Sequence, residues 1–437
     1  MDSDAFSPVV KNPDGQTYTL TLDLSIDSIY HLGGPQSLTF ECPVAHTSRL
    51  WIDMRTPGSV VFNNSVSPAN GAMYLESNST GGTIEFHGDG SAITGDVFVT
   101  QSELKIILDN ATAWGTANVR VSGGKSPSIN ALSDSTIGRS IRIDPGGTLN
   151  MAVESGDDDA TVTVTGVADA NRRMIYRGSG DVSVNPNLLS INANAGGGAG
   201  NLTVSFQPVD DGSGNAHKNK IEVPIQVAAG QTIQFDGSAQ GVQLWAKATT
   251  TQLPADVSGA GVFKVKGGTD PNKAIQVASD LTNAGGVMVE SGILAMVDTI
   301  FGTDAGGTGT MPTTGTVTVM LGATLDLNGL NGDGNGGQTI DVLAGGGVVE
   351  LDGAVLTVTG GVEPGDSMST LDVNGAGSLD LGAGAVSIFE LGALADPYDQ
   401  VILPGGANVT LAGELQVQDA GGLQAGDYTL FDLTGGT

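Results

Sequence analysis

One glycine-rich segment of the sequence, LDLNGLNGDGNGG, concentrates the oxygen-bearing side chains that a divalent cation needs. Calcium takes about six to eight oxygen ligands from carboxylates, amides and carbonyls. The spacing in this segment matches neither the EF-hand loop nor the tandem calcium-binding nonapeptide. Two interpretations therefore stay open, a structural calcium site and a plain Asx-Gly turn. The candidate ligands are Asp326, Asn328, Asn331, Asp333 and Asn335.

Groups for catalysis are sparse and poorly spaced. The histidines His31, His46, His87 and His217 are scattered without the spacing of a metal site. The sequence contains no phosphate-binding loop, no nucleophile elbow and no zinc-protease helix motif. Cys42 is the only cysteine, so an internal disulfide is excluded, and we expect it to be a small core residue. We predict that the protein is not an enzyme and requires no cofactor.

Two acidic clusters are the features that would support an enzyme. They are Asp157–Asp159 and Asp210–Asp211, with Arg172, Arg173 and Arg177 as basic neighbours in the sequence. A polysaccharide lyase or hydrolase built on a β-helix needs a proton acceptor near calcium-binding carboxylates, or paired carboxylates. We interpret the clusters as solvated turns and a surface group of arginines. A polysaccharide-acting β-helix enzyme stays the alternative if Arg and Asp side chains share a cleft.

The elements that carry these candidate residues are short strands. From about Ile141 onward, strand-like runs such as TLNMAV, TVTVTG and LTVSF follow one another, separated by Gly-Gly, Asp-Gly or Gly-Asn. Residues 273–284 fit a strand better than a helix. We predict an all-β chain with a β-rich domain or solenoid cap over residues 1–145, less regular than the rest, and a parallel β-solenoid over residues 146–437.

Apolar and polar residues alternate most clearly in TLDLNG, VVELDG and VLTVTG. Side chains of a strand point alternately to its two faces, so one set must fill the core while the other faces solvent. We expect the core set to contain Leu325, Leu327, Leu351, Leu371, Leu379 and Leu381. We expect the outward set to contain Asp326, Asp352, Asp372 and Asp380.

The negative charge of the chain argues against some classes of partner. No lysine or arginine follows Lys273, while the same stretch contains 20 Asp and Glu residues, and the formal net charge is −30. A polyanion repels nucleic acids and anionic membranes. No apolar stretch reaches the roughly 18 residues of a membrane span. We therefore predict no nucleic-acid partner and no membrane insertion.

The C-terminal third resembles a known family. GATLDLNG followed by QTIDVLAGGGVVELDGAVLTVTGG resembles the autotransporter-associated β-strand repeat of bacterial passenger domains. VEPGDSMSTLDVNGAGSLDL and DPYDQVILPGGANVTLAGELQVQDAGGLQAGDYTLFDLTGG are similar to the stretches that follow it. The likeness is close over residues 322–437, loose over 146–321 and absent over 1–145. The family usually has Ser-Pro-Gly where this chain has SMS at 367–369.

The resemblance implies a right-handed parallel β-helix, secretion and a role on the bacterial cell surface. The first residues, MDSDAFSPVV, lack the basic and apolar regions of a signal peptide, so either a signal has been removed or the chain is cytoplasmic. With the resemblance, we expect a removed signal. The predicted function is that of an extracellular structural protein, either an adhesin-like passenger or a subunit of a surface filament or layer, with a surface glycan or protein as partner. A phage-type fibre or capsid-surface protein is a further alternative.

The final strand-like run suggests a contact between copies. An open solenoid end exposes unpaired backbone groups and core side chains. The run YTLFDLTGG is the most aromatic piece of the C-terminal region, and all 17 basic residues lie before it, at or before Lys273. We predict a head-to-tail assembly edge; the alternative is that residues beyond 437 cover this end. The edge residues are Tyr428, Leu430, Phe431 and Leu433.

Overall fold

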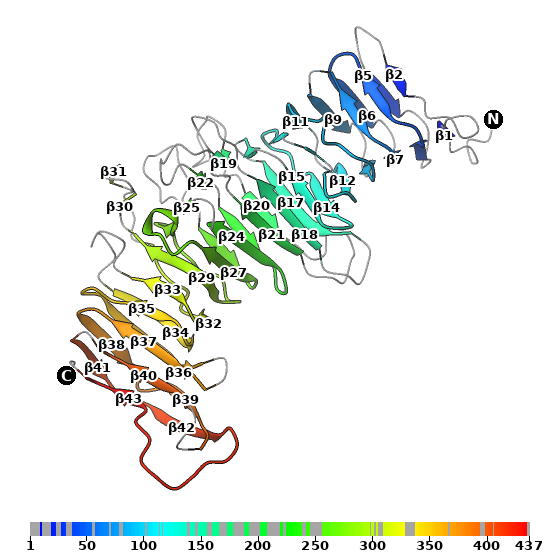
Figure 1. The fold of residues 1–437 in the computed structure, drawn as a ribbon. Helices are drawn as coiled ribbons and strands as arrows, with labels where there is room; N and C mark the ends of the chain where they lie inside the picture. Colours follow the sequence, from blue (N-terminus) through cyan, green and yellow to red (C-terminus); the bar gives the residue numbers. More distant parts are fainter. Residues whose placement is uncertain are drawn as a thin grey trace. The chain divides into compact units, whose positions relative to one another are not determined.

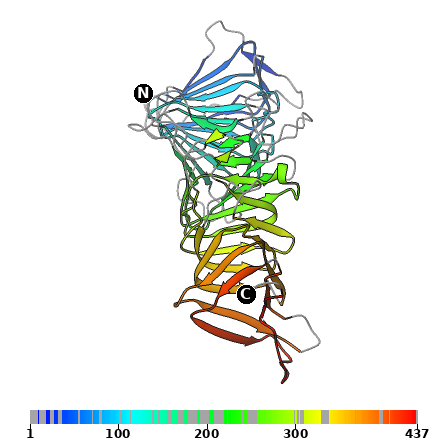
Figure 2. The same ribbon diagram turned by 90° about the vertical axis from the view of Figure 1, so that its left-hand side faces the viewer.

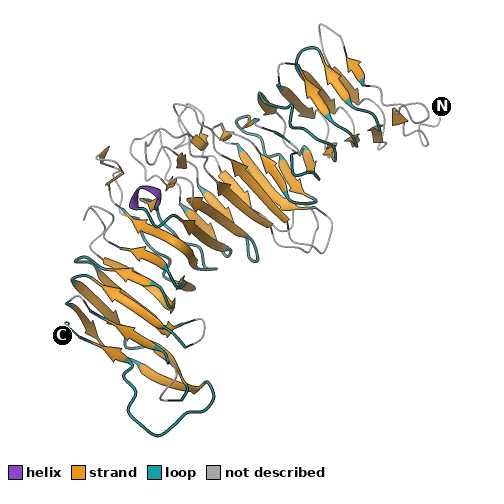
Figure 3. Cartoon of the chain, viewed as in Figure 1, coloured by secondary structure: helices purple, strands orange, loops and turns teal. Residues whose placement is uncertain are grey.

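The described chain is built from β-strands, with one 3-10 turn, η1 (Pro271–Lys273), and no α-helix among the described residues (Figure 3). It divides into a first unit, 1–211 with 223–232, and a second unit, 212–222 with 233–437. No described helix has the length and apolarity to cross a membrane. The computed structural model describes residues 9–434 except 11–18, 23–27, 32–36, 55–56, 70, 78–81, 101–102, 113, 116, 138–139, 145–146, 155–159, 166–172, 178–187, 192–201, 208–218, 222–223, 238–241, 245–255, 298, 301–302, 305–308, 328–336, 366–367, 394–397 and 405.

Strands of the first unit pair in parallel with the strands one turn before and after them (Figure 1). We number its sheets I to IV. Sheet I contains β1 (Val9–Val10), β4 (Ser37–Phe40), β7 (Gly58–Phe62), β10 (Gly82–Phe86), β12 (Lys105–Leu108), β14 (Ser128–Ala131), β17 (Thr148–Val153), β20 (Leu188–Ile191) and β23 (Ile225–Val227). Sheet II contains β3 (Ser28–His31), β6 (Leu50–Met54), β9 (Met73–Ser77), β11 (Asp96–Val99), β13 (Asn118–Val121), β16 (Ser140–Ile143) and β19 (Arg173–Arg177). Sheet III contains β2 (Leu20–Leu22), β5 (Val44–His46) and β8 (Val66–Pro68), and sheet IV contains β15 (Ser135–Ile137), β18 (Ala160–Thr165) and β21 (Leu202–Gln207).

Turns in the middle of the first unit are 22 to 24 residues long, because Val60 pairs with Ile84, Ile84 with Ile106, and Ile106 with Ile129. All four side chains are fully buried. Alternation along each strand therefore directs one column of branched apolar residues into the core. Sheet I continues across residue 145 through the pairing of β14 with β17, so strands on both sides of this position belong to the same parallel sheet.

An aromatic column runs beside these aliphatic residues. Phe40 and Phe62 stack with their ring centroids 5.1 Å apart and their planes 7° apart. Phe62 and Phe86 stack at 5.4 Å and 13°, and Trp114 meets Phe86 edge-on at 6.0 Å. Because parallel in-register strands place equivalent residues above one another, one aromatic residue per turn produces this column.

The second unit is also dominated by parallel pairs, and in Figure 2 its strands lie one above another in successive turns. Sheet V contains β22 (Asn219–Ile221), β25 (Val242–Leu244), β28 (Ile275–Val277), β29 (Val287–Met296), β33 (Ala323–Asp326), β35 (Val348–Glu350), β37 (Thr370–Asn374), β40 (Gln400–Ile402) and β43 (Phe431–Asp432). Sheet VI contains β24 (Thr232–Gly237), β27 (Val262–Gly267), part of β29, β32 (Thr316–Val319), β34 (Gly337–Gly345), β36 (Val355–Pro364), β38 (Gly377–Leu381) and β41 (Ala407–Thr410). The other strands are β26 (Val257–Gly259), the antiparallel pair β30 (Thr299–Ile300) and β31 (Thr303–Asp304), and the parallel pair β39 (Val386–Leu391) and β42 (Glu414–Asp419).

Strand β29 takes part in both sheets of the second unit, since its first half pairs with β32 and its second half with β33. The bend between the halves includes Gly292, which has a φ of +68°. A Cβ atom there would lie 2.1 Å from the backbone carbon of Gly267. Only glycine fits this corner. Strand β28 lies within 273–284, as the sequence predicted.

The predicted alternation is confirmed for the leucine set and for most of the outward set. All six leucines are buried. Asp352 is exposed, and Asp372 and Asp380 are half-exposed. The prediction that Asp326 faces solvent is wrong, because this side chain is only 7% exposed. Its neighbour in register, Ala295, is fully buried as well. Alternation assigns a side chain to the outer face of the sheet, but chain that packs over this face can still bury it.

Candidate functional site

The segment predicted to bind calcium is described only at its start. Asp326 ends strand β33 and is buried. Asn328, Asn331, Asp333 and Asn335 lie outside the described residues. Among the described residues there is no group of three or more acidic, histidine or cysteine side chains arranged to hold a metal ion. Calcium at this segment stays a prediction.

The remaining catalytic candidates are not brought together in the described structure. Cys42 is buried, as predicted. His46 is also buried. His217 and both acidic clusters, Asp157–Asp159 and Asp210–Asp211, lie outside the described residues. Arg172 lies outside them too, and His31, Arg173 and Arg177 belong to strands whose side chains are not described. Of the candidates whose side chains the structure describes, only His87 enters a group of titratable side chains.

The predicted assembly edge lies on the last described turn. Tyr428 donates a hydrogen bond from its hydroxyl to a backbone carbonyl at 2.8 Å, and Phe431 packs edge-on against another phenylalanine ring at 5.4 Å. Leu430 is half-buried, whereas Leu433 is 37% exposed. Two of the four residues therefore anchor this turn to the preceding one, and the head-to-tail contact itself stays a prediction.

Two further exposed apolar side chains of this region lie on β42, which the sequence pattern did not single out. Leu415 is 52% exposed and Val417 is 48% exposed. They pair in register with Ser387 and Phe389 of β39, both of which are buried. Leu415 and Val417 thus continue two columns of core residues. They are exposed because no described residue packs over them on this turn.

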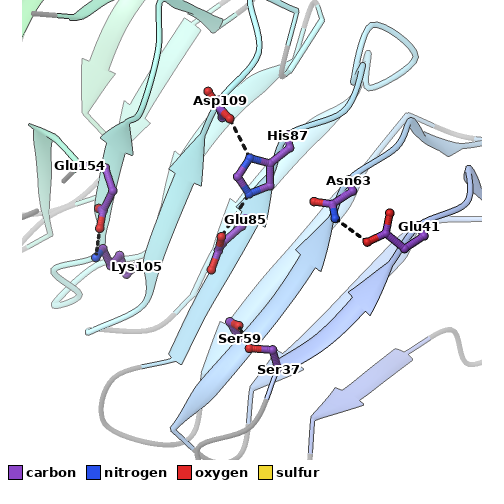
Figure 4. A network of polar contacts seen from close by, with 9 residues as sticks. All are labelled: Ser37, Glu41, Ser59, Asn63, Glu85, His87, Lys105, Asp109 and Glu154. Carbon is purple, nitrogen blue, oxygen red and sulfur yellow. Dashed lines mark hydrogen bonds and ion pairs between the residues drawn. The ribbon is translucent and has the colours of Figure 1, made fainter. Parts of the chain in front are cut away.

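A second group of polar side chains lies on the outer face of sheet I (Figure 4). Here Ser37 and Ser59 share a hydrogen bond of 2.7 Å, and Lys105 forms an ion pair with Glu154 across two turns. Asn130 lies between them in the sheet and donates to Glu154 at 2.6 Å. These contacts join successive turns side by side, as expected for polar columns on a parallel sheet.

The polar column continues at the carboxyl ends of the strands of sheet I, where His87 lies between two carboxylates. Its Nδ1 atom is 2.8 Å from Asp109 and its Nε2 atom is 3.1 Å from Glu85 (Figure 4). Partial burial lowers the pKa of His87, but hydrogen bonds and charge from Asp109 and Glu85 outweigh it and raise the pKa above the usual value. The protonated imidazole satisfies both carboxylates at once because both of its nitrogens are then donors.

This clamp makes a pH-dependent contribution to stability. Since the folded-state pKa is raised above that of the unfolded chain, the contribution is fully present below about pH 6.5 and is lost as pH rises through the folded pKa. We expect His87→Gln to reduce the free energy of unfolding more at pH 5.5 than at pH 8.5. Urea unfolding of both proteins across this range measures the difference. A difference that stays constant, or grows with pH, would contradict the clamp.

Sheet II has an unusual row of side chains on its outer face. Register aligns Trp51 with Tyr74, Tyr74 with Phe98, Phe98 with Arg120, and Arg120 with Arg142. The residues before and after each of them in its strand are mostly buried, so alternation directs this row away from the core. All five side chains are half-exposed. We call these five residues the aromatic–arginine stripe.

The rings of the stripe contact one another and two guanidinium groups. Tyr74 and Phe98 stack at 4.5 Å and 14°, and Trp51 lies 5.8 Å from Tyr74 at 37°. Arg49, an exposed residue beside the stripe, holds its guanidinium 4.9 Å from the Tyr74 ring centroid, and Arg120 lies 5.6 Å from that of Phe98. Because the faces of Tyr74 and Phe98 are turned toward each other, the stripe presents ring edges to solvent.

Carboxylates lie along the stripe. Glu76 accepts a hydrogen bond of 3.0 Å from the indole nitrogen of Trp51. Asp144 pairs with both Arg120, at 3.3 Å, and Arg142, at 2.8 Å. These contacts fix the side-chain conformations, and a carboxylate with about four acceptor positions still has acceptors to offer. The stripe therefore combines donors, acceptors and apolar ring edges on a regular sheet, an arrangement suited to binding.

The stripe could not be recognised from the sequence without the turn length. Its aromatic residues are 23 and 24 positions apart, from Trp51 to Tyr74 and from Tyr74 to Phe98. The recurrence of an aromatic residue at this separation is the signal that would have found it.

Comparison of the chain with protein-family models, with curated proteins and with solved structures finds no match.

Proposed function

We propose that this protein is a non-catalytic, extracellular protein of a bacterial cell surface, an adhesin-like right-handed β-helix that binds its partner through the aromatic–arginine stripe. The stripe is the observation that supports this proposal. Aromatic and arginine side chains are enriched at binding surfaces, where they contribute most of the affinity. The resemblance of residues 322–437 to bacterial passenger domains agrees with the same role.

The scaffold suits such a role. Parallel sheets satisfy backbone donors and acceptors from turn to turn, so the chain needs few ion pairs to hold its fold. A surface on such a sheet is pre-organised, which lowers the entropy lost on binding. The high negative charge favours solubility outside the cell and disfavours unspecific contact with polyanions.

Adhesion of coated beads tests the proposal. Beads carrying the purified protein are expected to be retained on a layer of bacterial or epithelial cells under flow. Tyr74→Ala should reduce retention about tenfold or more, because truncation of a central aromatic residue at an interface typically costs over about 1.4 kcal/mol. Retained bead number per unit area is the measurement.

A matched control is Tyr398→Ala, which removes a half-exposed tyrosine from the second unit. It should leave retention unchanged. Equal retention by wild type and Tyr74→Ala, with both proteins folded by circular dichroism, would refute the role of the stripe. Release of unsaturated or reducing sugars from polysaccharides by the wild type would favour the lyase or hydrolase alternative instead.

A further inference from the structure

We infer that the ligand of the aromatic–arginine stripe is a neutral, linear polysaccharide that lies along the stack of turns. This inference rests on the proposed function and names the partner of the same site. It follows from three features of the outer face of sheet II: the chemistry of its groups, its balance of charge, and its repeat distance.

The exposed groups match the hydroxyls of a sugar chain. Aromatic ring edges carry the positive end of the ring quadrupole, so they favour the oxygen atoms of a ligand. Arg49 offers guanidinium donors, and it has no carboxylate partner among the described residues. Glu76 and Asp96 offer acceptors, since each carboxylate is engaged by side chains at no more than two of its acceptor positions in the described structure. A hydroxyl donates and accepts, so it satisfies both kinds of group.

Charge balance separates this ligand from charged ones. Arg120 and Arg142 share Asp144, and the third arginine, Arg49, is matched by two further carboxylates along the same strands, Glu76 and Asp96. The surface thus has no excess of positive charge to hold a phosphate or sulfate chain, and the whole protein repels polyanions. A neutral polysaccharide forms the same hydrogen bonds without this repulsion.

Repeat distance supports an extended chain. Neighbouring strands of a sheet are about 4.8 Å apart, so equivalent groups recur at this interval along sheet II. One pyranose unit adds a similar length to an extended polysaccharide. The aligned residues from Trp51 to Arg142 therefore offer one side chain per turn over five turns. Successive sugar units can therefore meet successive turns.

The experiment uses cellohexaose and mannohexaose as neutral probes and polygalacturonate as the acidic one. Titration followed by NMR reports the indole N–H signal of Trp51, assigned by its disappearance in Trp51→Phe. We expect at least one neutral hexasaccharide to shift this signal in a saturable manner. Polygalacturonate should leave it in place. Arg49→Gln should weaken binding about tenfold, the loss typical of a hydrogen bond from a charged donor.

A charge-matched control is Lys266→Gln, which removes one positive charge from a half-exposed position of the second unit, where Lys266 pairs with Glu290. Its affinity should stay within about twofold of wild type. Saturable binding of polygalacturonate alone, or of neither kind of probe, would overturn the inference. If, in that case, beads carrying wild-type protein are still retained on cells and beads carrying Tyr74→Ala are not, the proposed function stands and only the ligand class is wrong. Equal affinity of wild type and Arg49→Gln for the neutral probes would place their site elsewhere.

Discussion

Replacing Leu325 with aspartate is expected to lower the free energy of unfolding by at least about 4 kcal/mol, because it places an unpaired charge in the core of the second unit. Leu325 is fully buried in β33. In register it lies between Leu294 and Val349, which are buried as well. No polar partner is available in this column to compensate the charge. Urea unfolding followed by circular dichroism measures the loss.

The neighbouring residue supplies the control. Thr324 precedes Leu325 and is half-exposed on the opposite face. Thr324→Asp introduces the same side chain and should cost about 1 kcal/mol or less, mainly through lower strand propensity. Similar losses for the two variants would show that the two faces of β33 are assigned wrongly.

Local patterning was enough to predict these two faces. Alternation depends only on the geometry of a single strand, so Leu325 and Leu327 could be placed in the core without knowledge of their neighbours. Asp326 shows what alternation along a single strand cannot predict. Its side of the strand follows from the pattern, whereas its burial depends on packing over that face, and its register neighbour Ala295 is buried as well.

The candidate site was beyond this reasoning, because it is made by register between turns. Trp51, Tyr74 and Phe98 are ordinary aromatic residues in three separate strands until the turn length aligns them. The same holds for His87 and Asp109, which are 22 residues apart in the sequence and 2.8 Å apart in space. A sequence of short strands predicts neither contact unless the length of every turn is known.

The second large effect is expected in the core of the first unit. Phe62 is fully buried between the stacked rings of Phe40 and Phe86. Phe62→Ala should lower the free energy of unfolding by about 4 kcal/mol, since it leaves a cavity and removes both stacking contacts. The buried indole of Trp114, which meets Phe86 edge-on, offers a fluorescence signal from the same column during unfolding.

Two control variants test whether the loss of stability comes from the aromatic column or would follow any substitution in the first unit. Val61 precedes Phe62 and is half-exposed on the outer face, so Val61→Ala should cost about 1 kcal/mol or less. Phe62→Leu keeps much of the volume and loses the stacking, so its cost should lie between those of the two alanine variants. If Phe62→Ala proves as stable as Val61→Ala, the rings are not packed inside the turns. In that case the register of sheet I would be wrong, and with it the alignment of neighbouring strands on which the aromatic–arginine stripe depends.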